Sequence, residues 1–239
     1  ADSLERSTIQ PHFGTRRKFL VNQKVRVSFS VDLAGSGNAG TAPRFGRLIK
    51  ACGFDEALVA LTSCTYTPLD DNADIDSVTL AFHADGQKHL VTGCRGTMKL
   101  SGAVSEFAKL AFEFTGIYNP VTDASMPVPT YANHATPVHV NYANTTNLSI
   151  NGFTDACLMS FEFDMKSQVV YRELVGCSKE VRITDRQGDG SLMVEAPALA
   201  DHDFFDDAID SDVGIIEFQH GQTAGNICTV TARANFGAP

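Results

Sequence analysis

The sequence predicts a mainly β protein built from antiparallel sheets of the β-sandwich or tube type, with short flanking α-helices. Three observations support this fold class. Along most of the chain, apolar residues alternate with polar ones, as they do in strands with one buried face. Turns that contain glycine separate these segments, and only two short segments have the spacing of an amphipathic helix. With 239 residues, the chain can form one large β domain or two similar domains in tandem.

The first clear strand covers residues 25–31, where four apolar side chains alternate with polar ones. It is followed by Gly35–Gly40, whose letters GSGNAG match the glycine fingerprint of a dinucleotide-binding turn. The strand before such a turn is continuously apolar and further βαβ units follow it. Neither feature is present here, so we predict a mobile glycine loop and no dinucleotide site.

A short helix is predicted over Pro43–Gly53. Phe45, Leu48, Ile49 and Cys52 occur at i, i+3, i+4 and i+7, which places them on one face. Proline stands near the first turn and glycine at the end, as is common at helix boundaries. We expect this helix to pack on the outside of a sheet.

Val78–Thr92 is predicted to form a β-hairpin. Alternating residues lead into Asp85-Gly86, and glycine tolerates the positive φ that a two-residue hairpin turn requires. Thr97–Ser101 continues the meander, and Leu110–Thr115 forms the next strand.

A proline-rich segment divides the chain. Residues 120–137 contain four prolines among small and polar residues, which is typical of a linker. We therefore predict a β-rich domain with a basic N-terminal arm over residues 1–119 and a second β-rich domain over residues 138–239. The expected elements of the second part are strands Leu148–Phe153, Ala156–Asp164, Glu180–Thr184, Leu192–Ala196, Ile215–Gln219 and Asn226–Arg233, a turn at Gly188-Asp189-Gly190 between the third and fourth strands, and a helix at Asp201–Ile209.

Charge is distributed unevenly along the sequence. Residues 1–50 contain 9 lysines and arginines against 3 aspartates and glutamates, whereas residues 51–239 contain 10 against 25. The densest basic cluster is Arg16-Arg17-Lys18. A nucleic-acid patch and a solvated basic turn are two interpretations of this cluster. We favour a third, in which the basic arm docks on the acidic body of a neighbouring subunit.

The sequence predicts neither a metal site nor a set of disulfides. Its six cysteines lie far apart, without CxxC pairs or the histidine spacing of a zinc site. We expect free thiols that act as small buried apolar residues. The acidic loop Asp70–Asp76 places oxygen atoms as a calcium loop does, but it lacks the glycine of the sharp turn and the closing glutamate. We interpret it as a solvated loop.

No catalytic residue or cofactor is predicted. His202 stands between Asp201 and Asp203, but adjacent residues on a helix point apart, and no nucleophile is paired with them. No apolar run approaches the roughly 20 residues of a membrane span, and the first residues lack the apolar segment of a signal peptide. We expect a protein that is made in a cytoplasm and does not insert into a membrane.

A set of short motifs spans most of the chain. They are Leu33-Ala34-Gly35-Ser36-Gly37, Ala39-Gly40-Thr41-Ala42-Pro43, Ala51-Cys52-Gly53-Phe54, Gly86, Gly93-Cys94-Arg95-Gly96-Thr97, Phe112-Glu113-Phe114-Thr115-Gly116-Ile117-Tyr118, Met126-Pro127, His220-Gly221 and Gly225-Asn226. In order and spacing the sequence resembles the tail tube (major tail) proteins of long-tailed, non-contractile-type bacteriophages. The resemblance implies a structural protein of the virion tail, made in the host bacterial cytoplasm, whose subunits assemble with one another and with other phage tail proteins.

The resemblance further implies rings of subunits that stack into a tube for double-stranded DNA. Strands of neighbouring subunits would pair edge to edge around each ring, and an acidic inner wall would let DNA slide without specific binding. Relatives usually have sequence ahead of the part that resembles Leu4-Glu5-Arg6, so we expect that an upstream segment is absent from this sequence. The candidates for the assembly interface are the arm residues Arg16, Arg17 and Lys18 and the loop residues Gly35, Gly37 and Gly40.

Both halves of the chain contain a strand, a short helix and a hairpin with glycine in its turn, in that order. Residues 25–33, 43–53 and 78–92 correspond to residues 192–196, 201–209 and 214–233. If the halves are duplicated tube domains, three chains make a ring of six domains. If the chain carries one tube domain, six chains are required.

A monomeric β-sandwich that binds carbohydrate or a surface receptor is the alternative from another functional class. Aromatic faces are the usual stacking platforms of such sites. The chain has no tryptophan and only 5 tyrosines, so we consider this alternative weaker.

Overall fold

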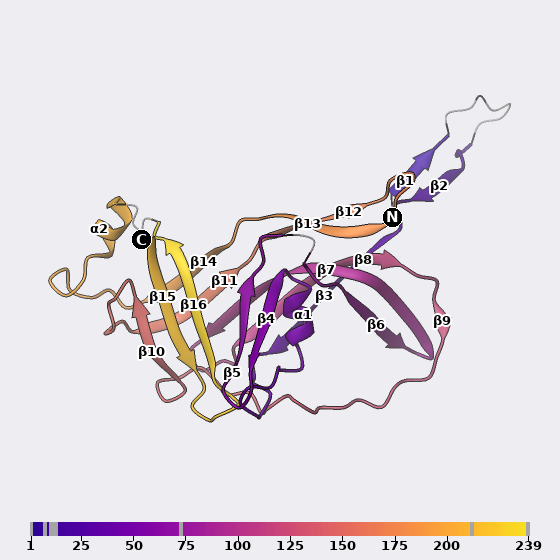
Figure 1. Cartoon of the computed structure of the whole chain (residues 1–239). Helices are drawn as coiled ribbons and strands as arrows, with labels where there is room; N and C mark the ends of the chain where they lie inside the picture. The colour runs from indigo at the N-terminus through magenta and orange to yellow at the C-terminus, as the bar shows by residue number, and fades with distance from the viewer. Residues whose placement is uncertain (1, 7–8, 10–13, 72–73, 211–212, 238–239) are drawn as a thin grey trace.

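The computed structural model describes residues 2–6, 9, 14–71, 74–210 and 213–237. Within them the chain is mainly β, with antiparallel sheets and two short helices (Figure 1), which confirms the predicted fold class. The elements are β1 (Asp2–Glu5), β2 (Lys18–Val21), β3 (Lys24–Asp32), α1 (Gly46–Lys50), β4 (Phe54–Val59), β5 (Ser63–Pro68), β6 (Val78–Ala84), β7 (Gln87–Ala103), β8 (Lys109–Tyr118), β9 (Thr122–Asp123), β10 (Thr145–Ile150), β11 (Leu158–Asp164), β12 (Ser167–Arg172), β13 (Glu180–Arg186), β14 (Asp189–Val194), α2 (Phe204–Asp210), β15 (Val213–His220) and β16 (Cys228–Asn235).

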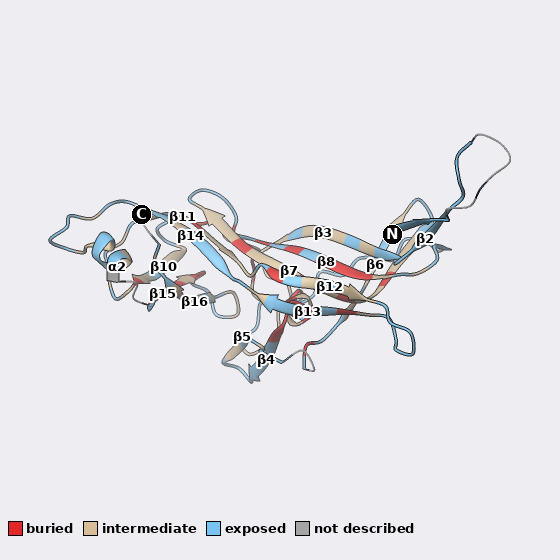
Figure 2. Cartoon of the chain, turned by 90° about the horizontal axis from the view of Figure 1, so that it is seen from above, coloured by how far each residue is buried: buried red, intermediate tan, exposed pale blue. Residues whose placement is uncertain are grey.

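The largest sheet has the strand order β14-β11-β7-β8-β3, with β6 and β9 paired to the remaining length of β7. Strict alternation in β8 explains why one face of this sheet is buried. Leu110, Phe112 and Phe114 are at most 3% exposed, whereas Lys109, Ala111 and Glu113 between them are exposed. Figure 2 shows the buried residues concentrated along the central strands of the molecule.

A second layer covers the apolar face of the large sheet. The three-stranded sheet β10-β15-β16 places Phe218 against Phe161, with 4.6 Å between the ring centroids. Beside it, α1 buries Ile49 in the same core. The predicted helix over Pro43–Gly53 is thus present but shorter, because the residues on either side of Gly46–Lys50 form turns.

The β6–β7 hairpin forms as predicted, with positive φ at both turn residues, Asp85 (47°) and Gly86 (77°). Thr97–Ser101 differs in that it belongs to the same strand as residues 87–92. Gly93 adopts a φ of 59°, and the pairing with β8 shifts register between Thr92 and Arg95. This bulge bends β7 without ending it.

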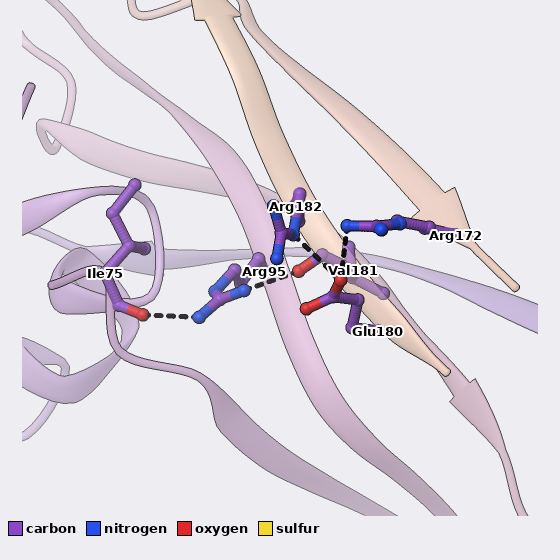
Figure 3. A network of polar contacts seen from close by, with 6 residues as sticks. All are labelled: Ile75, Arg95, Arg172, Glu180, Val181 and Arg182. Carbon is purple, nitrogen blue, oxygen red and sulfur yellow. Dashed lines mark hydrogen bonds and ion pairs between the residues drawn. The ribbon is translucent and has the colours of Figure 1, made fainter. Parts of the chain in front are cut away.

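The predicted turn at Gly188–Gly190 does not form a hairpin. β14 pairs with β11, and β13 pairs with β12, a strand that the sequence patterns did not predict. In the β12–β13 hairpin, Glu180 Oε1 accepts a hydrogen bond from Arg172 Nη1 (3.1 Å) and forms an ion pair with Arg182 Nε (2.9 Å), as Figure 3 shows. The hairpin crosses β7, where Ser167 N donates to Thr97 Oγ1 (3.1 Å).

Arg95 fixes this hairpin to the body of the protein. Its guanidinium donates to Val181 O of β13 and to Ile75 O of the loop before β6, both at 2.6 Å (Figure 3). A single side chain thereby satisfies two backbone carbonyls from segments that are about 100 residues apart in sequence.

Strands from both sides of residues 120–137 share the large sheet, since β11 and β14 extend the edge of β7. The segment itself contributes β9 and then runs to β10 with exposed Val128 and Tyr131. The division of the chain into two tube-like domains stays a prediction.

All six cysteines are free thiols, but burial was the wrong expectation for Cys157 and Cys177, which are exposed. Burial raises the pKa of Cys94 to about 11, so its thiol stays protonated at pH 8 in the folded chain. Because the thiolate is the reactive form, we expect a pulse of iodoacetamide at pH 8 to label Cys157 and Cys177 first. Mass spectrometry with and without urea measures this order, and equal labelling of Cys94 in the folded protein would contradict it.

Candidate assembly interface

Among the described strands, β3 forms one edge of the large sheet and pairs on one side only, with β8. At its two ends, Leu33 N donates to Ala108 O (2.8 Å) and Gln23 O accepts from Tyr118 N (3.4 Å). Odd-numbered residues are therefore turned toward β8, and the register with β8 has no shift between these ends. By the alternation of an antiparallel pair, the even-numbered residues from 24 to 32 present their N–H and C=O groups at the free edge.

The side chains of β3 leave this edge accessible. Lys24, Arg26, Ser28 and Ser30 are exposed, while the apolar residues between them are only half-buried. Within its nine residues the strand has neither proline nor a bulge, two of the devices that protect an edge from pairing. β3 is thus a ready template for another strand.

β14 forms the opposite edge of the five-strand path and, within the described part of the chain, pairs only with β11. Asp189, Gly190, Ser191 and Met193 are exposed. The large sheet therefore ends in an accessible strand on both sides.

The face of the large sheet opposite the core carries matched charges. Arg26 lies 3.5 Å from Glu113 across the β3–β8 pair, and Lys99 lies 2.5 Å from Glu162 across the β7–β11 pair. Exposed pairs of this kind contribute only about 0–1 kcal/mol each to stability. Their more important consequence is that Arg26 and Lys99 each already have a carboxylate partner within the chain.

The predicted basic residues Arg16, Arg17 and Lys18 lie in the N-terminal arm. β1 and β2 pair as a hairpin that projects from the body of the protein (Figure 1). The guanidinium of Arg17 lies 5.0 Å from the ring centre of Phe19, and Leu20 is 68% exposed. The arm thus presents cationic and apolar groups together.

The structure places Gly35, Gly37 and Gly40 apart from this arm, in contacts within the chain. Gly35 N donates to Asn226 Oδ1 (2.6 Å), and Gly37 N donates to Gly225 O (2.9 Å). Sequence spacing gave no sign that residues 35 and 226 meet, although both stand in the motifs of the resemblance.

Gly40 supports the turn between β4 and β5. A Cβ at Gly40 would lie 2.4 Å from Val59 O and from Leu61 N, so only glycine allows this approach. Leu58, Val59 and Leu61 are between 53% and 89% exposed. This apolar turn was not predicted, because the sequence patterns did not indicate the β4–β5 hairpin. Exposed apolar residues that cluster in this way often mark protein interfaces.

His202 and the acidic loop Asp70–Asp76 were the sequence features that suggested acid–base chemistry and a metal site. His202 Nε2 contacts Asp207 Oδ2 (2.9 Å), not the adjacent aspartates. Among the described residues, no group of three or more His, Cys, Asp and Glu side chains can hold a metal ion. Asn72 and Ala73 of the acidic loop lie outside the described residues. In the described part of the chain, no helix has the length and apolarity needed to cross a membrane.

The sequence matches the family model described as phage tail tube protein over residues 1–239, the whole chain. No curated protein matches the sequence. The match confirms the resemblance that the short motifs indicated, and it assigns the chain a structural role in the virion tail. This protein therefore belongs to the phage tail tube protein family.

Proposed function

We propose that copies of this chain join edge to edge into closed rings, and that the rings stack into a tail tube. The observation that carries this proposal is the free edge of β3, where five alternate residues, from 24 to 32, face outward and have no backbone partner among the described strands. Pairing of edges removes the groups that otherwise promote uncontrolled aggregation. A family whose members build tail tubes has a use for such an edge.

The channel of the tube is proposed to be acidic and to let double-stranded DNA pass without specific binding. The chain has a formal net charge of −9 at pH 7. On the face of the large sheet opposite the core, Arg26 and Lys99 lie beside Glu113 and Glu162. Phosphate groups bind to unmatched cations, so a wall of matched charges with a net negative body retains DNA weakly.

Contacts between stacked rings are proposed to involve two further surfaces. The basic arm residues Arg16, Arg17 and Lys18 would dock on the acidic body of a neighbouring subunit, to which opposite charge steers them. The loop with Gly35, Gly37 and Gly40 would act through the apolar β4–β5 turn that it supports.

Negative-stain electron microscopy over a rising protein concentration tests this function. We expect hollow rings and tubes, with end-on class averages of closed symmetry. Sixfold symmetry would assign one tube domain to each chain, and threefold symmetry would support the proposed duplication.

Small uniform particles at every concentration, also after addition of a phage tail initiator complex, would overturn the proposal. In that case binding to a glycan array would test the monomeric binding module instead.

A further inference from the structure

We propose that β3 of one copy pairs in parallel with β14 of the next copy. This inference rests on the ring assembly proposed above and names the two edges that make it. β3 and β14 end the five-strand path β14-β11-β7-β8-β3 on opposite sides. Because the joined edges differ, the contact is head-to-tail, the type that closes into a ring.

Strand direction requires the parallel arrangement. All four neighbouring pairs of this path are antiparallel, so β3 and β14 run in the same direction. Copies related by rotation about the axis of a ring keep their direction along that axis. The β14 of a neighbour therefore reaches β3 in parallel, whereas β6, which is antiparallel to β7, would reach it in the opposite direction.

Hydrogen bonds of β11 show which backbone groups β14 has free. Val104 N donates to Met159 O and Met165 N donates to Met98 O, both at 3.0 Å. From Met159 to Met165 the odd-numbered residues are therefore turned toward β7, and the even-numbered residues between them are turned toward β14.

Ser160, Glu162 and Asp164 of β11 lie opposite Met193, Ser191 and Asp189 of β14. The backbone groups of those three residues of β14 are thus used within the chain. The register shifts between Leu158 and Ser160, and beyond the shift Glu195 N donates to Cys157 O (2.9 Å), so Val194 is also turned away from β11. The residues of β14 that present N–H and C=O groups at the free edge are Gly190, Leu192 and Val194.

The side-chain faces of the two edges match in this arrangement. In a parallel pair, an outward-turned residue lies opposite a partner residue that is turned away, and both side chains stand on the same face. The polar residues of β3 would then adjoin Asp189, Ser191 and Met193. On the other face, Val27 and Phe29 would adjoin Leu192 and Val194, all of which are only half-buried in the single chain.

Charge along the two strands is also complementary. β3 begins with Lys24 and Arg26, and the side chain of Arg26 is 74% exposed. β14 begins with Asp189, whose side chain is 58% exposed and which lies opposite Asp164, the last residue of β11. Lys166 and Glu113 already pair with Asp189 and Arg26, and exposed pairs of this kind rearrange at low cost. A parallel junction brings the cationic start of one strand to the same end as the acidic start of the other.

Two proline variants test the pairing of edges. Ser28→Pro removes an outward N–H of β3, and Val194→Pro removes one of β14. Neither N–H is bonded within the sheet, and proline is tolerated at such edge positions. Ser28→Thr and Val194→Ile keep these N–H groups and serve as matched controls. Circular dichroism checks that each variant is folded.

We expect each proline variant alone to stay monomeric under conditions in which the wild type and both controls form rings. An equimolar mixture is expected to give heterodimers and nothing larger, because Ser28→Pro retains its β14 edge and Val194→Pro retains its β3 edge. Sedimentation velocity measures these species.

Several outcomes would overturn the inference. Rings formed by Val194→Pro alone would assign another partner edge, such as β6, and homodimers of Val194→Pro would indicate β3 paired with itself. If a variant does not fold, hydrogen exchange of wild-type rings supplies the readout, and unchanged amide exchange at Leu192 and Val194 on assembly would contradict the junction. A wild type that never forms rings refutes the proposed function itself, which is a different result.

Discussion

Replacing Phe218 with alanine is expected to lower the free energy of unfolding by about 3–5 kcal/mol, because the ring is fully buried and its removal leaves a cavity. Phe218 joins the two layers of the fold. Its ring lies 4.6 Å from that of Phe161 and 6.2 Å from that of Phe163, both on β11 of the large sheet. Urea unfolding followed by far-ultraviolet circular dichroism, at concentrations below assembly, measures the change.

Ile215→Ala is the matched control for this variant. Ile215 lies on the same strand, β15, but on its opposite face and is 45% exposed. Its replacement is expected to cost less than about 1 kcal/mol, mainly through lower strand propensity. A similar loss of stability in both variants would show that Phe218 does not connect the layers as described.

Gly35→Ala is expected to destabilise the chain by about 3 kcal/mol, the upper part of the usual cost of overpacking. The added Cβ would lie 2.0 Å from Gly225 O and 2.7 Å from Asn226 Cα, and both of these are backbone atoms. Relief of the clash requires separation of the two loops, which also breaks the hydrogen bond from Gly35 N to Asn226 Oδ1. The midpoint of urea unfolding is the measurement.

Gly188→Ala controls for the effect of removing a glycine as such. The nearest atom to its added Cβ is Asp164 O at 3.5 Å, an ordinary contact, and the residue is exposed. We expect a change within about 0.5 kcal/mol. Wild-type stability of Gly35→Ala would mean that the loops at residues 35 and 225 do not pack as the structure shows.

The strands with one buried face were predictable because local alternation encodes them. β3, β8 and the β6–β7 hairpin appear where the sequence predicts them, since a period of two and a glycine turn need no knowledge of distant residues. The continuity of β7 was not predictable, because Gly93 marks a bulge and a turn equally well. The Gly188 turn was misread for a related reason, since only tertiary pairing separates β13 from β14.

The candidate interface was predictable in kind but not in position. Exposed alternating residues indicate an edge strand only after the sheet order is known, and that order depends on pairing between residues such as Phe161 and Gly102. The basic cluster Arg16-Arg17-Lys18 was visible in the sequence, and the structure places it in a projecting hairpin. Contacts of Gly35 with Asn226 bridge 191 positions, a separation at which local patterns carry no information.

Residue-resolved hydrogen exchange at β3, compared between monomers and assembled tubes, tests the edge-pairing account most directly. In the monomer we expect slow exchange at Val27 and Phe29, whose amides bond to β8, and fast exchange at Ser28 and Ser30, whose amides face the free edge. Assembly should slow exchange at Ser28 and Ser30 and leave Val27 and Phe29 protected. Fast exchange at Ser28 and Ser30 in intact tubes would contradict the account, because it would show that β3 remains an open edge after the tube has formed.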